Sequence, residues 1–123
     1  IGILMVHGFT GSPASLKPWA QAMHEKGLTV FLPTLAGHGT HWSDLNKVKW
    51  EDWYEGIERE FLELSKHCDQ VFIAGFSVGG ALALRLSQIR GSEMAKCGEQ
   101  TSGAMCAILG VEIDVAKEIA QDF

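Results

Sequence analysis

The sequence predicts an α/β domain in which a small parallel sheet lies between two layers of helices. Three short, continuously apolar segments alternate with helix-like segments along the chain. Strands that are apolar throughout are typical of parallel sheets with both faces covered. The 123 residues are 46% hydrophobic and 20% charged, which is the balance of one packed domain of ordinary size. We therefore expect a three-layer fold with about four strands.

The first expected element is a buried strand at residues 2–6, followed by a helix at 13–26. Ser12 can cap this helix and Pro13 suits its first turn, while apolar side chains recur at helical spacing. A second buried strand follows at residues 28–32. Because the chain opens directly on a strand, we interpret its start as a point inside a larger fold.

The rest of the chain continues the alternation of helices and strands. In order, we expect a loop at 34–48, an amphipathic helix at 50–66, a third strand at 71–75, a helix at 79–95, a fourth strand at 104–109 and a short helix at 113–122. Right-handed crossovers place the first three strands in the spatial order 2-1-3 and the fourth beside the third. The predicted sheet is thus narrow, and its two edges are open.

The segment Gly75–Gly79, with the sequence GFSVG, joins the third expected strand to the helix after it. A strand, G-x-S-x-G and a helix in this order form a nucleophile elbow, in which a sharp turn presents the serine hydroxyl at the end of a sheet. Ser77 is therefore the candidate catalytic nucleophile. A serine needs an adjacent general base to attack an ester at neutral pH, and no histidine follows Ser77 in this sequence.

Three motifs carry a resemblance to a known family: HGFTGSP at residues 7–13, GHG at 37–39 and GFSVGG at 75–80. With these motifs in this order, residues 1 to about 86 resemble the α/β-hydrolase carboxylesterases and monoacylglycerol lipases. The resemblance implies a truncated α/β-hydrolase fold.

The same resemblance assigns roles to individual residues. It implies that Ser77 is the nucleophile and that the backbone N–H groups of Phe9 and Val78 form the oxyanion hole. His7 precedes the oxyanion loop, where the family uses this histidine to hold the loop, so we expect a structural role for it. His38 lies in the GHG loop, where we expect it to brace the loop by a hydrogen bond. By analogy with the family, it is also the histidine nearest the site.

The end of the chain resembles a different family. Residues 85–94 (RLSQIRGSEM) and 102–110 (SGAMCAILG) are similar to malonyl-CoA:acyl-carrier-protein transacylase. Because that family also has a G-x-S-x-G elbow, we interpret the chain as a chimera, engineered or natural, that is joined just after Ser77. A natural fragment or a rearranged gene is the simpler alternative. The expected division is a truncated hydrolase-like core at 1–86 and a transacylase-like tail at 87–123 that completes one compact domain.

The second resemblance singles out Arg90, because the arginine of this segment binds the malonyl carboxylate in the transacylases. Arg90 follows Ser77 by only 13 residues, which is closer than that family places it. On one continuous helix the separation is about 20 Å, too far for the side chain to contact the same substrate atoms. We therefore expect a solvated or helix-terminal charge, with carboxylate binding as the alternative.

Four interpretations of function stay open. In the resembled hydrolases the acid and the base of the triad lie well downstream of the serine, and those segments are missing here. We expect a carboxylesterase-type serine hydrolase fragment with little or no activity. The alternatives are a weak serine esterase that uses Ser77 on a small acyl ester, an acyl (malonyl) transferase, and a non-catalytic folding or assembly module.

Composition bounds the partners of the chain. A net charge of −5 argues against a nucleic-acid partner, no apolar run is long enough to span a bilayer, and no signal peptide is recognisable. The three cysteines lack a C-x-x-C spacing, and the histidines and carboxylates lack the spacing of zinc ligands. We expect reduced thiols, a cytoplasmic protein, and neither a metal nor a cofactor. The open sheet edges favour a homo-oligomer, which we expect to be a homodimer, and exchange of the tail between chains is one way to form it.

Overall fold

The computed structural model describes residues 1–97. Its elements are β1 (Gly2–Val6), the 3-10 helix η1 (Pro13–Ser15), α1 (Lys17–Glu25), β2 (Thr29–Phe31), the 3-10 helix η2 (Trp42–Lys47), α2 (Trp50–Ser65), β3 (Val71–Gly75) and α3 (Val78–Cys97). The chain divides into two compact units, Ile1–Leu86 and Ser87–Phe123. The sheet and the candidate site belong to the first unit.

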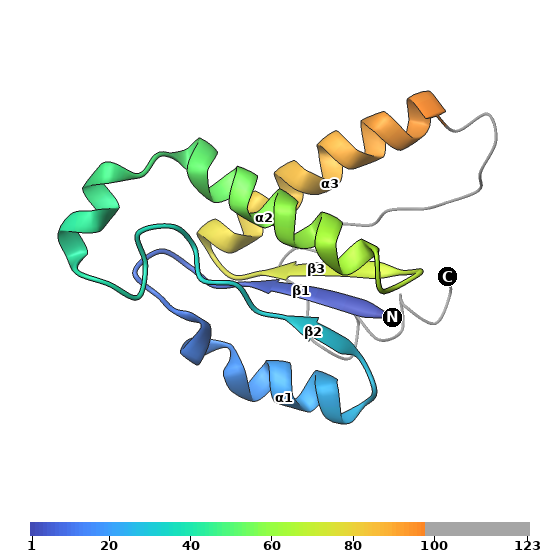
Figure 1. Ribbon diagram of the computed structural model, residues 1–123, viewed down its shortest axis with the longest axis horizontal. Helices are drawn as coiled ribbons and strands as arrows, with labels where there is room; N and C mark the ends of the chain where they lie inside the picture. The colour runs from blue at the N-terminus through green and yellow to red at the C-terminus, as the bar shows by residue number, and fades with distance from the viewer. Residues whose placement is uncertain (98–123) are drawn as a thin grey trace. The chain divides into compact units, whose positions relative to one another are not determined.

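The sheet of the described residues has three parallel strands in the order β2-β1-β3, which confirms the predicted order (Figure 1). The register pairs Gly2 of the central strand with Thr29 of β2 and with Val71 of β3. At the other end of β1, Val6 pairs with Gly75, so the elbow begins where the central strand ends. The expected strand at 104–109 and helix at 113–122 lie outside the described residues.

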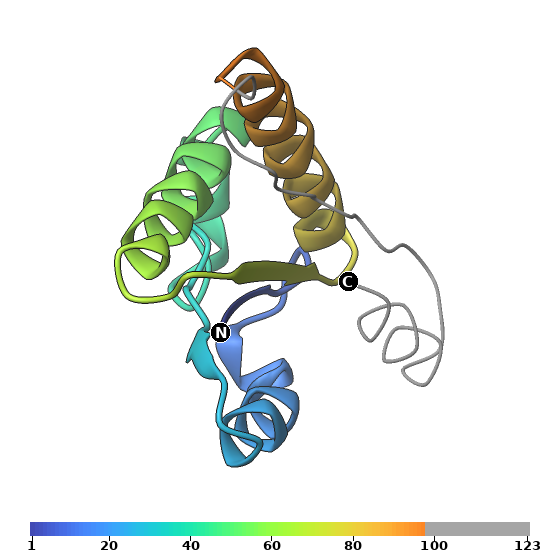
Figure 2. The same cartoon turned by 90° about the vertical axis from the view of Figure 1, so that its right-hand side faces the viewer.

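Helices cover both faces of this sheet, which confirms the three-layer architecture. Within the first unit, α2 and the first turns of α3 lie over one face and α1 lies on the other (Figure 2). The core under α2 and α3 consists of buried aliphatic side chains: Leu4, Val6, Leu35, Ile57, Leu64, Leu82 and Leu86. Their removal from water supplies the main favourable term that holds the strand–elbow–helix unit together.

Two of the expected elements differ from the structure. The helix predicted at 13–26 is split into η1 and α1, because Pro18 has no N–H and is tolerated only in the first turn of a helix. The loop predicted at 34–48 contains η2, whose first turn is capped by the His41 side chain accepting a hydrogen bond from the Ser43 N–H at 3.4 Å. Among the described residues, no helix is long and apolar enough to cross a membrane.

Candidate functional site: a serine at a nucleophile elbow

Ser77 lies in a sharp turn between β3 and α3, with its backbone in the left-handed region (φ 56°). Such a conformation costs a non-glycine residue of order 1–3 kcal/mol, and it persists only where the surrounding structure enforces it. The turn is closed by the Gly79 N–H, which donates to the Phe76 carbonyl at 3.0 Å, and by the Gly80 N–H, which donates to the Ser77 carbonyl at 2.9 Å. The Ser77 side chain is left exposed at the end of the sheet.

The two glycines of the motif are required by close approach of the backbone. A Cβ atom on Gly75 would collide with the backbone of Gly79, on the opposite side of the turn. A Cβ atom on Gly79 would collide with the carbonyl oxygen of Val6, at the end of β1. Glycine at both positions therefore lets α3 begin directly against the central strand, which aims its N-terminus at the site.

The loop Gly8–Gly11 after β1, which the resemblance implies is the oxyanion loop, lies against this elbow. Its turn is closed by the Gly11 N–H, which donates to the Gly8 carbonyl at 3.0 Å, and Thr10 is the second non-glycine residue with a positive φ, 60°. A Cβ atom on Gly8 would approach Ser77 to 3.2 Å. Within the described part of the chain, neither the Phe9 N–H nor the Val78 N–H donates a hydrogen bond, which is what a pair of oxyanion donors requires.

His7 is fully buried and both of its ring nitrogens contact the backbone. The Leu35 N–H donates to Nε2 at 3.1 Å, so the proton lies on Nδ1, which donates to the Gly8 carbonyl at 2.9 Å. Burial of the ring lowers the pKa of His7 below its ordinary value and keeps the imidazole neutral. His7 thus ties the oxyanion loop to the segment after β2, and it has no free nitrogen with which to act as a general base.

His38 belongs to a cluster of rings that includes Trp53, Phe9 and His7. Its Nδ1 lies 3.1 Å from the Ala36 carbonyl, and the same oxygen accepts a hydrogen bond from Trp53 Nε1 at 2.8 Å. The ring centroid of His38 lies 5.0 Å from that of His7, 5.9 Å from that of Phe9 and 5.6 Å from that of Trp53. The GHG loop, the oxyanion loop and α2 therefore meet at one point.

Residues 3–116 match the alpha/beta hydrolase family. The chain belongs to the α/β-hydrolase family. A thermostable monoacylglycerol lipase of Bacillus sp. (strain H-257) is 43% identical over 88 residues, which are 72% of this chain and 35% of that protein. A carboxylesterase of Bacillus subtilis (strain 168) is 31% identical over 86 residues, 68% of this chain and 35% of that protein.

Solved structures of this family share the fold. A structure of the metagenome-derived lipolytic enzymes LipS and LipT superposes with a TM-score of 0.69 at 37% identity, over 73% of this chain and 37% of that chain. An extracellular alpha/beta-hydrolase from a Paenibacillus species gives a TM-score of 0.61 at 24% identity, over 72% of this chain and 35% of that chain, and is alike in fold alone. This chain thus spans about a third of the length of the curated relatives that it matches.

The comparisons confirm the hydrolase resemblance over the first part of the chain. The relatives match 86 to 88 residues, which agrees with the length of the predicted stretch from 1 to about 86. The match to the α/β-hydrolase family itself continues to residue 116, across the junction that we placed just after Ser77 and into the segment that resembles a transacylase. The chimeric origin of the chain and the division into a core at 1–86 and a tail at 87–123 stay predictions.

Arg90, the residue implied by the transacylase resemblance, lies in α3 within the second unit. Its guanidinium Nη1 pairs with the Glu93 carboxylate, one helical turn further on, at 3.0 Å. An i,i+3 ion pair of this kind is typical of a helix surface. The binding of a substrate carboxylate by Arg90 stays a prediction, and this contact gives it no support.

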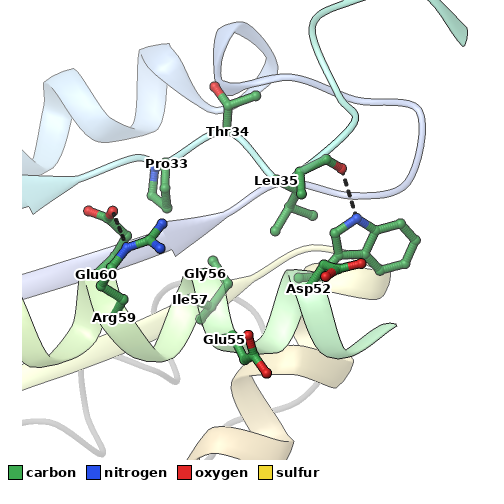
Figure 3. A pocket seen from close by; sticks show the side chains of 11 residues that line it. Pro33, Thr34, Leu35, Asp52, Glu55, Gly56, Ile57, Arg59 and Glu60 are labelled. Carbon is green, nitrogen blue, oxygen red and sulfur yellow. Dashed lines mark hydrogen bonds and ion pairs between the residues drawn. The ribbon is translucent and has the colours of Figure 1, made fainter. Parts of the chain in front are cut away.

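A hollow with a volume of about 340 Å³ lies between α2 and the segment after β2 (Figure 3). Charged side chains line it, among them Arg59 and Glu60, which pair at 3.8 Å. None of its lining residues belongs to the elbow or to the oxyanion loop of the α/β-hydrolase site. Among the residues that the structure describes, no group of three His, Cys, Asp or Glu side chains can hold a metal ion.

The Trp53–Ala36 hydrogen bond is the feature of the site that the sequence does not predict. From the sequence, Trp53 is one of four apolar residues on the buried face of the helix at 50–66, and its ring indeed packs against the core. Nothing in the pattern shows that the indole N–H meets the carbonyl oxygen before the GHG loop, because a contact between residues 17 positions apart depends on the tertiary fold.

Proposed function

We propose that this chain is a carboxylesterase-type hydrolase fragment in which Ser77 is acylated by small esters and the acyl group is released slowly. The observation that carries the proposal is the left-handed Ser77 at the start of α3, beside a loop with an unengaged Phe9 N–H. The relatives named as a monoacylglycerol lipase and a carboxylesterase support carboxylic esters as the substrate class.

In the acylation step, Ser77 Oγ attacks the ester carbonyl carbon and its proton passes to water or hydroxide. The carbonyl oxygen becomes an oxyanion that accepts hydrogen bonds from the N–H groups of Phe9 and Val78. Collapse of this intermediate breaks the C–O bond of the ester and leaves the acyl group on Ser77, and the departing alkoxide takes a proton from water to become the alcohol. An oxyanion hole with substrate binding leaves roughly 10³–10⁴-fold catalysis over water when a triad is incomplete.

Turnover is expected to be slow for a reason that lies in the residues of this chain. Hydrolysis of the acyl-serine needs a base that activates water, and no histidine follows Ser77. His7, which lies next to the oxyanion loop, has both ring nitrogens engaged with the backbone. An activated ester therefore gives one acylation event per chain, followed by a slow phase.

The test is the release of p-nitrophenolate from p-nitrophenyl acetate by the wild type and by Ser77→Ala. We expect a burst of about one equivalent in the wild type, no burst in Ser77→Ala, and an acetylated Ser77 peptide in the mass spectrum. Ser65→Ala removes an exposed hydroxyl at the end of α2 and serves as the matched control. Equal rates in the wild type and in Ser77→Ala would overturn the proposal and leave a non-catalytic module.

A further inference from the structure

The Ala36 carbonyl accepts hydrogen bonds from two side chains of different elements. Trp53 Nε1 approaches it from the first turn of α2 at 2.8 Å, and His38 Nδ1 approaches it from the GHG loop at 3.1 Å. This double contact ties the loop to the helix. The backbone of the loop is further restricted, because the glycines on either side of His38 both have left-handed φ angles, 72° and 73°.

We call the pair of hydrogen bonds to the Ala36 carbonyl the Ala36 clamp. The Phe9 ring packs against the rings of both of its donors, His38 and Trp53. Its centroid lies 5.9 Å from that of His38 and 6.1 Å from that of Trp53, while 54% of the Phe9 surface is exposed. The N–H of Phe9 lies in the same peptide plane as the Gly8 carbonyl, which accepts hydrogen bonds from His7 Nδ1 and from the Gly11 N–H. The contacts of the ring hold the Phe9 end of this peptide and the two hydrogen bonds hold its Gly8 end, so together they set the direction of the N–H.

The chemistry of His38 is hard to explain by packing alone. The side chain is only 6% exposed, yet its Nε2 has no hydrogen-bond partner in the described part of the chain. A buried polar atom without a partner is destabilising, and a phenylalanine ring would avoid that cost. What histidine offers at this position and phenylalanine does not is the hydrogen bond from Nδ1 to the Ala36 carbonyl.

We propose that His38 and Trp53 are positioning residues for the oxyanion hole, which act by clamping Ala36 and seating the Phe9 ring on their own rings. This inference rests on the proposed function, because it assumes that the Phe9 N–H stabilises an oxyanion. It requires both parts of each side chain, the ring that contacts Phe9 and the N–H that reaches Ala36.

Three variants separate these parts. His38→Phe keeps the ring and removes the donor, His38→Asn keeps a donor and removes the ring, and Trp53→Phe keeps a ring and removes the indole N–H. Trp42→Phe is the matched control for Trp53→Phe, because Trp42 is an exposed tryptophan in η2 whose ring contact is with His41. His24→Asn, on the exposed surface of α1, controls for the histidine substitutions.

The first readout is the burst rate constant for p-nitrophenyl acetate and for its thiono analogue, in which sulfur replaces the carbonyl oxygen. Sulfur is a poor hydrogen-bond acceptor, so the ratio of the two rate constants reports the oxyanion hole. Removing an oxyanion donor outright costs about 10²–10³ in rate, so we expect its misplacement to lower the oxygen-ester rate about tenfold and the ratio about fivefold. A merely structural role lowers both rates equally and leaves the ratio unchanged, and that result overturns the inference.

The second readout does not depend on activity. With ¹⁵N-phenylalanine labelling, the amide signal of Phe9, assigned by its loss in Phe9→Leu, is one of six phenylalanine signals in the wild type, and each variant that introduces a phenylalanine adds a seventh. We expect it to move in all three variants and to stay in place in Trp42→Phe and His24→Asn. If the wild type shows no burst but the signal moves, the proposed function fails while the contact of Phe9 with His38 and Trp53 stands. If the signal does not move, the clamp itself is refuted.

Discussion

Ser77 and Thr10 are the two non-glycine residues with left-handed backbone among those that the structure describes, and they belong to the two loops expected to bind the oxyanion. Strain of this kind has to be offset by the surrounding contacts. At Ser77 the offset comes from the turn hydrogen bonds and the docking of α3. Near Thr10 it comes from His7, whose ring links the loop to the Leu35 N–H.

His7 makes the stability of the domain sensitive to pH. Burial lowers its pKa in the folded state below the value of 6.5 that it has when exposed. Between these two values the unfolded chain binds a proton that the folded chain does not, so the free energy of unfolding falls as the pH drops below about 6.5, by up to about 1.4 kcal/mol per pH unit. The contribution is fully present above this range.

We therefore expect the wild type to lose more stability between pH 7.5 and pH 5.5 than His7→Gln, which cannot titrate. Urea denaturation at both pH values, followed by circular dichroism, measures the difference. His24→Gln replaces an exposed histidine of α1 and should retain the pH dependence of the wild type. Parallel curves for the wild type and His7→Gln would show that another group is responsible.

At the level of the elements, the strand–elbow–helix unit requires glycine at the points where two backbone segments approach each other closely. Gly79 faces the carbonyl of Val6, whereas a Cβ atom on Gly56, in the middle of α2, would meet nothing within 4 Å. We expect Gly79→Ala to destabilise the fold by about 3 kcal/mol or more through overpacking. Gly56→Ala should stabilise it by about 1 kcal/mol, because alanine is the better helix former. Chemical denaturation of the pair at pH 7.5 checks both signs, and a tolerated Gly79→Ala would mean that α3 does not dock on β1 as described.

The elements that the sequence predicts well are those with a strong local pattern. The apolar runs mark β1 and β3, the amphipathic spacing marks α2, and G-x-S-x-G marks the turn before α3. The sequence does not predict the break between η1 and α1. Pro13 suggests that one helix begins at residue 13, whereas Pro18 requires a new helix to begin just before it. The clamp on Ala36 was missed because it joins a loop and a helix that share no local signal.

At the scale of the whole molecule, one large apolar side chain of the sheet is left half exposed. Phe72 of β3 is 50% exposed, while its neighbours Val71 and Ile73 pack against the core under α2. It therefore points to the opposite face of the sheet, the side of α1.

The homodimer expected from the sequence stays a prediction. Sedimentation equilibrium should show the mass rise from 13.4 kDa towards twice that value with concentration, and a constant 13.4 kDa would contradict it.

Whether release of the acyl group from Ser77 waits for a base can be tested by adding a base from solution. If Ser77 is acylated but lacks a base for release of the acyl group, free imidazole should accept the proton of the attacking water. We expect the slow phase with p-nitrophenyl acetate to rise in proportion to the imidazole concentration at pH 7.5, while the amplitude of the burst stays constant.

Imidazole also cleaves activated esters by itself, so the informative quantity is the difference in slope between the wild type and Ser77→Ala. A positive difference means that acylated Ser77 is the species rescued, since the variant has no acyl-enzyme to turn over. The rescue should survive Ser65→Ala and disappear when the burst is absent. Equal slopes would mean that release of the acyl group does not wait for a base, so that the absence of a histidine after Ser77 could not explain slow turnover.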